Sequence, residues 1–433
     1  MARTSMDSTS FYRIVWRWHF YAGLIVLPVL LWLATTGALY LYKPEIERNW
    51  YGAWSERSLP GEAASLETIR RNVEIQTKGK VTRIERAADP DASWRVGVEM
   101  PDGGKRTAFV DPVVGLVLGT VSGGGIMETV KQLHSLAITG PVGNTLVEIV
   151  AGWAILLCVT GFILWWPRGT NKALALRGSP RHRRFWRDFH GSTGALVGGV
   201  LLFLAITGMP WSGVWGGWLR DGVNAVGLGR PAAPGPAAGD HADHETRETL
   251  PWSMRDGMMP AAHHAHAISA DRAAQIAAGK GMTGALALSF PKAPGAPWVA
   301  SAPASRVQDG HVLFIDPFDG AVLQEVRYGD VGAGARAIEW GIYTHQGQQY
   351  GEVNRLVMLA GCIGVWLLAL SAPIMWWKRR KDGRLSAPPR AMPEGRMRSV
   401  TAAMLAIGAL FPLTGATMLA ALGGEWLWRR RVR

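Results

Sequence analysis

The sequence predicts a mainly α-helical membrane protein made of two tandem repeats. Each repeat has two membrane-spanning helices around a small α+β domain. Three observations lead to this fold class. The chain contains several apolar runs of the roughly 20 residues that a helix needs to cross a bilayer. Its 21 tryptophans cluster near the ends of these runs, where aromatic side chains anchor helices at the membrane surface. Basic residues crowd the short loops between runs, which indicates the cytoplasmic side.

The charge and the cysteines exclude other classes of protein. A formal net charge of +13 over 433 residues is also found in nucleic-acid-binding proteins. Here the basic residues lie mostly in loops between apolar runs, so membrane topology explains them and we predict no nucleic-acid partner. Cys158 and Cys362 both lie inside apolar runs, and the chain has no C-x-x-C-H motif. The sequence therefore predicts neither a disulfide framework nor covalently attached haem.

The first repeat begins at the N-terminus. Residues 1–42 hold a short basic segment and the first spanning helix. This run is long and no A-x-A site follows it, so we expect a signal anchor instead of a cleavable signal peptide. Residues 43–125 show strand-like alternation around one short helix and predict the first outer α+β domain, with Asp102-Gly103-Gly104 as a hairpin turn. Residues 126–166 begin with an amphipathic segment that carries His134 and continue as the second spanning helix.

The second repeat has the same order, followed by a C-terminal extension. Its segments are a basic cytoplasmic loop (167–187), the third spanning helix (188–215), a linker with the second outer α+β domain (216–340), the fourth spanning helix with His345 (341–377), a second basic loop (378–398), a fifth apolar helix (399–424) and a basic tail (425–433). If the fifth helix spans, the basic tail ends outside, against the charge rule. A re-entrant or interfacial segment with the tail inside is the alternative.

Three pairs of segments match in the same order along the chain, which is the signature of an internal repeat. The pairs are FVDPVVGLVLGTV (109–121) with FIDPFDGAVLQEV (314–326), Leu133–Arg168 with Tyr343–Arg380, and the start of the first helix with the start of the third, His19 over His190. Because each half crosses the membrane twice, the two halves have the same orientation and form a parallel repeat.

Four histidines occupy corresponding places in the two repeats. His19 and His190 lie at the inner ends of helices one and three, and His134 and His345 at the outer ends of helices two and four. Ionisable side chains at membrane depth are costly, and their usual explanation is function. A single histidine of this kind is as readily an interfacial residue with one hydrogen bond. The repeat, however, brings His19 toward His190 and His134 toward His345.

Two facing imidazoles make a bis-axial iron site, as in b-type haem, which is held without covalent links. The sequence therefore predicts two b-type haems, one near each membrane face. Gly191 and Gly194, and likewise Gly347 and Gly351, would keep the helix surfaces beside the histidines small. Zinc is the alternative occupant, but two histidines leave it short of its usual four ligands.

A second candidate metal site lies in the outer linker, which has no counterpart in the first repeat. Its soft ligands are His241, His244, Met254, Met258, Met259, His263, His264 and His266. Such a composition can bind copper or other soft metals. The alternative is a flexible linker whose composition is coincidental.

The chain has no Ser/His/Asp arrangement, no Walker loop and no dinucleotide-binding fingerprint. The sequence thus predicts no flavin or nicotinamide site. Electrons would come from a separate donor: quinol, a flavoprotein or a soluble reductant.

Over nearly all of residues 11–380 the chain resembles the PepSY-associated transmembrane family, whose members are also called iron-regulated membrane proteins. The resemblance rests on the W-R-W-H start of helix one, on LHSLAITG…WWPR, on His190 and His345, and on the paired F-[VI]-D-P-x-x-G-x-V-L segments that end the two PepSY-like domains. In two respects the chain departs from the pattern: His345 lies in Y-T-H-Q-G, and the His/Met linker is long.

Similar proteins include ferric-siderophore reductases of the FoxB type. The resemblance implies a multi-pass protein of the bacterial inner membrane with both PepSY-like domains in the periplasm. It also implies two b-type haems ligated by His19, His190, His134 and His345, and a ferric siderophore as substrate. The long His/Met linker leaves a copper-handling or other metal-binding protein as an alternative.

Two further hypotheses belong to other functional classes. A non-enzymatic PepSY membrane regulator would use the histidines structurally, but their symmetric pairing argues against it. A transporter would also suit a parallel repeat. Its helices are few, however, and the apolar runs hold no acidic residue apart from Glu148, near an end.

Overall fold

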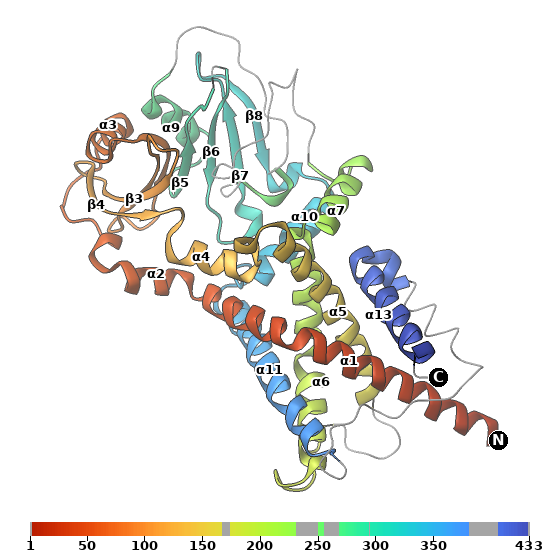
Figure 1. The fold of residues 1–433 in the computed structure, drawn as a ribbon. Helices are drawn as coiled ribbons and strands as arrows, with labels where there is room; N and C mark the ends of the chain where they lie inside the picture. Colours follow the sequence, from red (N-terminus) through yellow and green to blue (C-terminus); the bar gives the residue numbers. More distant parts are fainter. Residues whose placement is uncertain are drawn as a thin grey trace.

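A computed structural model describes residues 2–166, 174–230, 250–254, 268–293, 295–380 and 406–431. In this part of the chain a bundle of long helices carries a β-sheet at one end (Figure 1). Four helices are long and apolar enough to cross a membrane: Phe11–Leu41, Pro141–Trp165, Arg183–Trp211 and Gly351–Trp377. They overlap the four predicted spanning helices. The segments 126–166 and 341–377, however, each divide into two helices, so His134 and His345 end short separate helices and do not lie on the second and fourth spanning helices.

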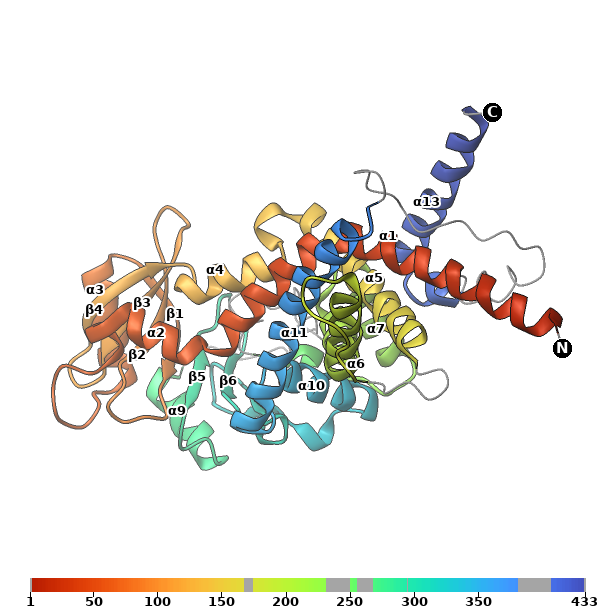
Figure 2. The same ribbon diagram turned by 90° about the horizontal axis from the view of Figure 1, so that it is seen from below.

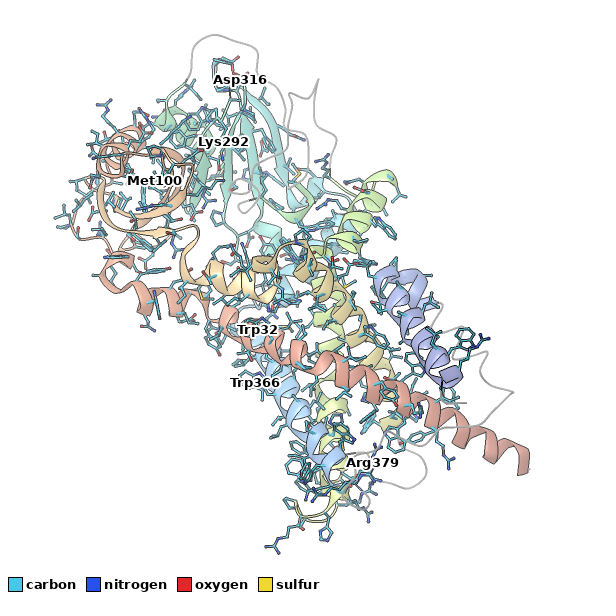
Figure 3. All side chains as sticks on the ribbon, in the orientation of Figure 1. Trp32, Met100, Lys292, Asp316, Trp366 and Arg379 are labelled. Atoms are coloured by element: carbon cyan, nitrogen blue, oxygen red, sulfur yellow. The ribbon has the colours of Figure 1, made fainter. Side chains whose placement is uncertain are left out.

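The bundle is arranged so that helices from different repeats pack together. Its long helices are α1 (Ala2–Leu41), α5 (Pro141–Trp165), α6 (Arg183–Gly208) and α11 (Gly351–Trp377). Helix α1 packs on α5 and α11, and α6 packs on the same two helices. Helices α1 and α6 therefore face each other across the interior. Figure 2 shows α1 running from the N-terminus to the sheet. We call the two ends of the bundle the sheet end and the basic end, the latter being where Arg379 follows α11 (Figure 3).

All eight strands lie in one antiparallel sheet, in the order β4-β3-β2-β1-β5-β6-β7-β8. The strands are β1 (Lys80–Arg86), β2 (Trp94–Glu99), β3 (Lys105–Asp111), β4 (Leu116–Ser122), β5 (Leu286–Ser289), β6 (Trp298–Ala302), β7 (His311–Ile315) and β8 (Val322–Arg327). Strand β1 pairs with β5, with Ile84 opposite Leu288, so the strands of the two predicted outer domains form one sheet. Each half would otherwise expose an unpaired edge strand at this seam.

The two halves also share one hydrophobic core. Helices α3 (Leu66–Thr77) and α9 (Ala270–Gly279) cover the same face of the sheet, and buried residues of both halves pack together beneath them. The Asp271 carboxylate on α9 accepts a hydrogen bond of 2.6 Å from the amide of Leu66 at the start of α3. An acceptor at this position satisfies one of the free amides at a helix start.

The repeated F-[VI]-D-P-x-x-G segment forms a tight turn after β3 and again after β7. The Asp111 carboxylate accepts hydrogen bonds from the Ser58 hydroxyl and from the amides of Ser58, Leu59 and Val113. Burial acts to raise the pKa of this carboxyl, but the hydroxyl and amide bonds outweigh burial and hold the pKa below its usual value. Gly115 has φ +70°, as Gly320 has φ +79° in the second copy. The motif therefore builds the same turn in both halves.

The C-terminal apolar segment differs from the predicted helix of residues 399–424. The described helix, α13 (Pro412–Arg431), begins at Pro412, which suits the first turn of a helix. It packs on α5, where Trp153 Nε1 donates to Thr417 Oγ1 at 3.0 Å. Within the described residues it is not one of the helices long and apolar enough to span. Residues 399–405 lie outside the described part.

Gly115 and Gly103 both have positive φ, but only Gly115 is closely surrounded by other atoms. A comparison of the two therefore separates the cost of backbone strain from that of steric crowding. A Cβ at Gly115 would lie 3.2 Å from the Ile69 Cα, whereas a Cβ at Gly103 (φ +78°) would have nothing within 4 Å. Both alanine substitutions place a side chain in the left-handed region, at a cost of about 1 kcal/mol. We expect Gly115→Ala to lower the apparent unfolding temperature more than Gly103→Ala, measured by tryptophan fluorescence of the full chain in detergent. Equal shifts would contradict this account of the turn.

Candidate cofactor site

The histidine pair at the basic end meets across the centre of the bundle. His19 lies on α1 and His190 on α6, and their ring centroids are 6.4 Å apart with the ring planes at 89°. A metal ion bonded to one nitrogen of each ring at about 2 Å would place the two centroids about 6 Å apart. The spacing of the rings therefore suits one metal ion between them.

The second pair lies at the sheet end, where two short helices terminate. Helix α4 (Gly125–His134) ends at His134 and α10 (Ala333–His345) ends at His345. The residue before each histidine is tied to a spanning helix through its carbonyl. Trp32 Nε1 on α1 donates to the Leu133 carbonyl at 2.8 Å, and Asn354 Nδ2 on α11 donates to the Thr344 carbonyl at 2.9 Å. Figure 3 shows Trp32 on α1. These bonds fix where each short helix ends.

Each of the four histidines makes the same hydrogen bond to a hydroxyl group on a spanning helix. The Nδ1 bonds are His19 to Thr160 (2.9 Å), His190 to Ser371 (2.8 Å), His134 to Thr36 (3.0 Å) and His345 to Thr207 (2.9 Å). The three threonine hydroxyls also donate to the carbonyl four residues earlier, at 2.7–2.8 Å. Ser371 donates to the Leu368 carbonyl at 3.2 Å.

These hydroxyl bonds favour the same tautomer for every ring. A hydroxyl has one proton to donate, and here that proton goes to the backbone carbonyl. The hydroxyl oxygen therefore accepts the bond from Nδ1–H of the histidine. Each ring then keeps Nε2 as the nitrogen with a free lone pair, the form that ligates a metal.

A glycine follows each of the three threonines and leaves room for the imidazole. A Cβ at Gly161 would lie 3.3 Å from Cε1 of His19, and a Cβ at Gly37 would lie 3.3 Å from Cε1 of His134. A Cβ at Gly208 would likewise lie 3.5 Å from Cε1 of His345. The Thr-Gly dipeptide inside three apolar runs was the signal for these partners, and sequence analysis missed it.

The glycines that sequence analysis placed beside the histidines divide into two kinds. Gly191 and Gly194 lie on α6 and line the cavity between the helices, as expected. Gly347 has φ +74° in the turn between α10 and α11, and Gly351 has φ +62° at the first residue of α11. Their interpretation as small residues on a helix surface was wrong, because backbone conformation explains glycine at both positions.

One cavity of about 1940 Å³ is lined by all four histidines. An ordinary small-molecule pocket measures about 300–1,000 Å³. The cavity extends from Arg379 at the basic end to Arg83 and Arg95 on the sheet. It therefore offers space for a large planar group at each histidine pair.

The donor set fits haem better than zinc. Within the described residues there is no group of three or more His, Cys, Asp or Glu side chains placed to hold one ion. Zinc uses three or four protein ligands, whereas a b-type haem needs two axial ligands from the protein. His19 with His190, and His134 with His345, would hold the two groups.

The soft-metal site predicted in the linker is largely outside the described residues. This applies to His241, His244, Met258, Met259, His263, His264 and His266. Met254 is described, and it is buried in an apolar cluster with Leu250, Val312 and Phe314 against the sheet. Its thioether therefore packs in the core of the outer domain.

The acidic residue inside a spanning helix has a structural partner. Glu148 on α5 is buried, and its carboxylate accepts hydrogen bonds from the amides of Val214 at 3.0 Å and Trp215 at 3.2 Å. These amides begin helix α7 (Val214–Ala225), so a negative charge is stabilised there. Glu148 thus caps a helix.

Removal of one hydroxyl tests the assignment of the tautomers. We expect Thr160→Val to weaken haem binding at the His19–His190 pair about tenfold or more, because the ring loses its orienting partner. Thr160→Ser keeps the hydroxyl and should retain most of the affinity. Titration of the haem-free chain in detergent, followed by its optical spectrum, measures both. If the valine and serine variants bind equally well, the hydroxyl does not position His19.

The chain was compared with known protein families and with curated proteins. The family model described as PepSY-associated TM region matches residues 16–379. No curated protein matches the chain. The matched range contains the sheet, all four histidines, three of the four spanning helices in full and most of the first. The chain therefore belongs to the PepSY-associated transmembrane family.

Proposed function

We propose that this protein binds two b-type haems and transfers electrons through the membrane to reduce a ferric siderophore, or another metal complex, at the sheet end. The observation that carries the proposal is the set of four matching Nδ1–hydroxyl bonds, which gives two histidine pairs ready to ligate at opposite ends of one cavity. A purely structural role for these histidines would not require the same tautomer four times.

Residues of this chain would hold the two haems and shield them from water. His19 and His190 would hold one at the basic end, and His134 and His345 the other at the sheet end. Bound haem would supply a one-electron iron couple at each end. Because Nδ1 of each ring binds a hydroxyl on a spanning helix, Nε2 on the other side of the ring points away from that helix. The apolar side chains of α1, α5, α6 and α11 that line the cavity would limit the entry of water once both haems are bound.

The proposed substrate fits the chemistry at the sheet end of the cavity. Siderophores bind ferric iron through hard oxygen ligands, and reduction to ferrous iron weakens that match. The cavity reaches polar side chains of the sheet there, among them Arg83, Thr107 and Ser301. Such a surface can hydrogen-bond a polar metal chelate.

The proposed setting is the bacterial inner membrane with the sheet in the periplasm. This orientation is supported by the basic residues around Arg183 and Arg379, at the end of the bundle opposite the sheet. The electron donor would then act from the membrane or the cytoplasm, as quinol, a flavoprotein or a soluble reductant.

The first test is the optical spectrum of the purified protein, oxidised and dithionite-reduced, with a pyridine haemochrome assay. We expect a low-spin b-type spectrum with about two haems per chain. His19→Ala should lose the haem at the basic end and His345→Ala the haem at the sheet end, one haem each. A well-folded protein without haem would contradict the proposal.

The second test concerns the reaction. Dithionite-reduced protein, freed of excess reductant, should be reoxidised by a ferric siderophore, with ferrous iron trapped by a colorimetric chelator. The His345→Ala variant should release at least tenfold less ferrous iron per chain, because the site nearest the sheet has lost its ligand. His182→Ala, a substitution of an exposed histidine that does not line the cavity, serves as the control. Equal release from all three proteins would show that the sheet-end pair does not take part.

A further inference from the structure

The same length of helix separates the two histidine pairs on both sides of the cavity. On α6, His190 lies 17 residues before Thr207, which bonds the sheet-end His345. On α1, His19 lies 17 residues before Thr36, which bonds the other sheet-end histidine. At a rise of 1.5 Å per residue, the two pairs are about 25 Å apart along the bundle. Electron transfer from one pair to the other therefore depends on what fills the cavity between them.

Among the described residues that line the cavity, aromatic side chains gather at its two ends, apart from Phe162 on α5. The lining near the basic end includes Trp16, Phe20 and Trp376, and near the sheet end it includes Tyr40, Trp211 and Trp252. Between the ends, α5 and α6 contribute several small residues to the lining, among them Ala154, Ala195 and Gly198. The middle of this wall thus has room for one larger side chain.

Phe162 follows Thr160 by two residues, near the basic-end pair, but its ring is directed toward the middle of the bundle. A Cβ at Gly198 on α6 would lie 2.8 Å from Cζ of Phe162. Gly198 is buried, and it comes 8 residues after His190 and 9 residues before Thr207. These intervals correspond to about 12 and 14 Å of helix. The tip of the ring therefore lies close to the midpoint between the two histidine pairs.

The internal repeat does not duplicate this ring. In α11 the matching position, 211 residues later as for the sheet-end histidines, is Pro373. On α1 the residue 8 positions after His19 is Leu27, which corresponds to Gly198 on α6. Pro373 and Leu27 both line the cavity. Symmetric packing of the two repeats thus does not account for the aromatic ring of Phe162.

We propose that Phe162 sets the rate of electron transfer between the two haem sites, because its ring fills the middle of the gap between them. This inference rests on the proposed function. Electronic coupling between two metal sites falls off faster through empty space than through packed side chains, so a ring at the midpoint raises the transfer rate. One electron moves from ferrous iron at the basic end to ferric iron at the sheet end. The ring is neither oxidised nor reduced, no bond changes, and the quinol, flavoprotein or soluble reductant proposed as donor replaces the electron.

The test measures electron transfer across a membrane without a siderophore. The full chain is reconstituted in phosphatidylcholine vesicles that contain ferricyanide, dithionite is added outside, and the loss of ferricyanide absorbance gives the rate per chain. We expect Phe162→Ala to lower this rate severalfold and Phe162→Leu, which keeps part of the side chain, to lower it less. Ile163→Ala, the matched control, shortens an apolar side chain of α5 that does not line the cavity and should keep the full rate. His345→Ala should fall to the rate of vesicles without protein.

Two further measurements separate this role from a general effect on the fold. The haem-free Phe162→Ala chain should bind about two haems, with the optical spectrum and midpoint potentials of the unaltered chain, because both histidine pairs are intact. Leu27→Phe, introduced into Phe162→Ala, should restore much of the transfer rate, since it places an aromatic ring at the same level from the opposite wall of the cavity.

Four outcomes would overturn the inference. The first is a rate for Phe162→Ala equal to that of the unaltered chain, and the second is equal slowing by Ile163→Ala. Loss of a haem or a shifted potential in Phe162→Ala would assign the ring to cofactor binding. Failure of Leu27→Phe to restore the rate would show that transfer does not depend on a ring at this level. In each of these cases the unaltered chain still carries two haems, whereas a chain without haem would mean that the proposed function itself fails.

Discussion

The hydrogen bond from a histidine Nδ1 to a hydroxyl of a neighbouring spanning helix is the contact on which the site depends. It joins α1 to α5, α6 to α11, α4 to α1 and α10 to α6, so four inter-helix contacts also set four ring orientations. Since each hydroxyl gives its proton to a backbone carbonyl, the tautomer follows from the geometry of the helix itself. The same four hydrogen bonds therefore hold the helices together and leave Nε2 of each imidazole as the nitrogen that could bind a metal.

The shared sheet has a comparable role at the other end of the molecule. Pairing of β1 with β5 and the contact between α3 and α9 join the two repeats outside the membrane. Because α4 and α10 follow the last strand of each half, the joined sheet also sets where those helices end. His134 and His345 are held from both sides, by the sheet through the chain and by Trp32 and Asn354 through hydrogen bonds.

Much of this arrangement was predictable because its signals are local. The four spanning helices and the turn at Gly103 follow from composition over short windows. The pairing of His19 with His190 followed from the internal repeat, and the structure places their rings 6.4 Å apart. Gly347 was misassigned because a small residue on a helix surface and a positive φ in a turn both select glycine.

The sequence by itself determined the family, the spanning helices and the four histidines, because apolar length and a repeated motif are visible without a fold. Only the tertiary structure decided that the two outer halves share one sheet. The sequence of an edge strand does not show which other edge strand it pairs with. The tertiary structure also decided the hydroxyl partners of the four histidines. Thr160 lies 141 residues from His19, and only the packing of α1 against α5 brings them to 2.9 Å.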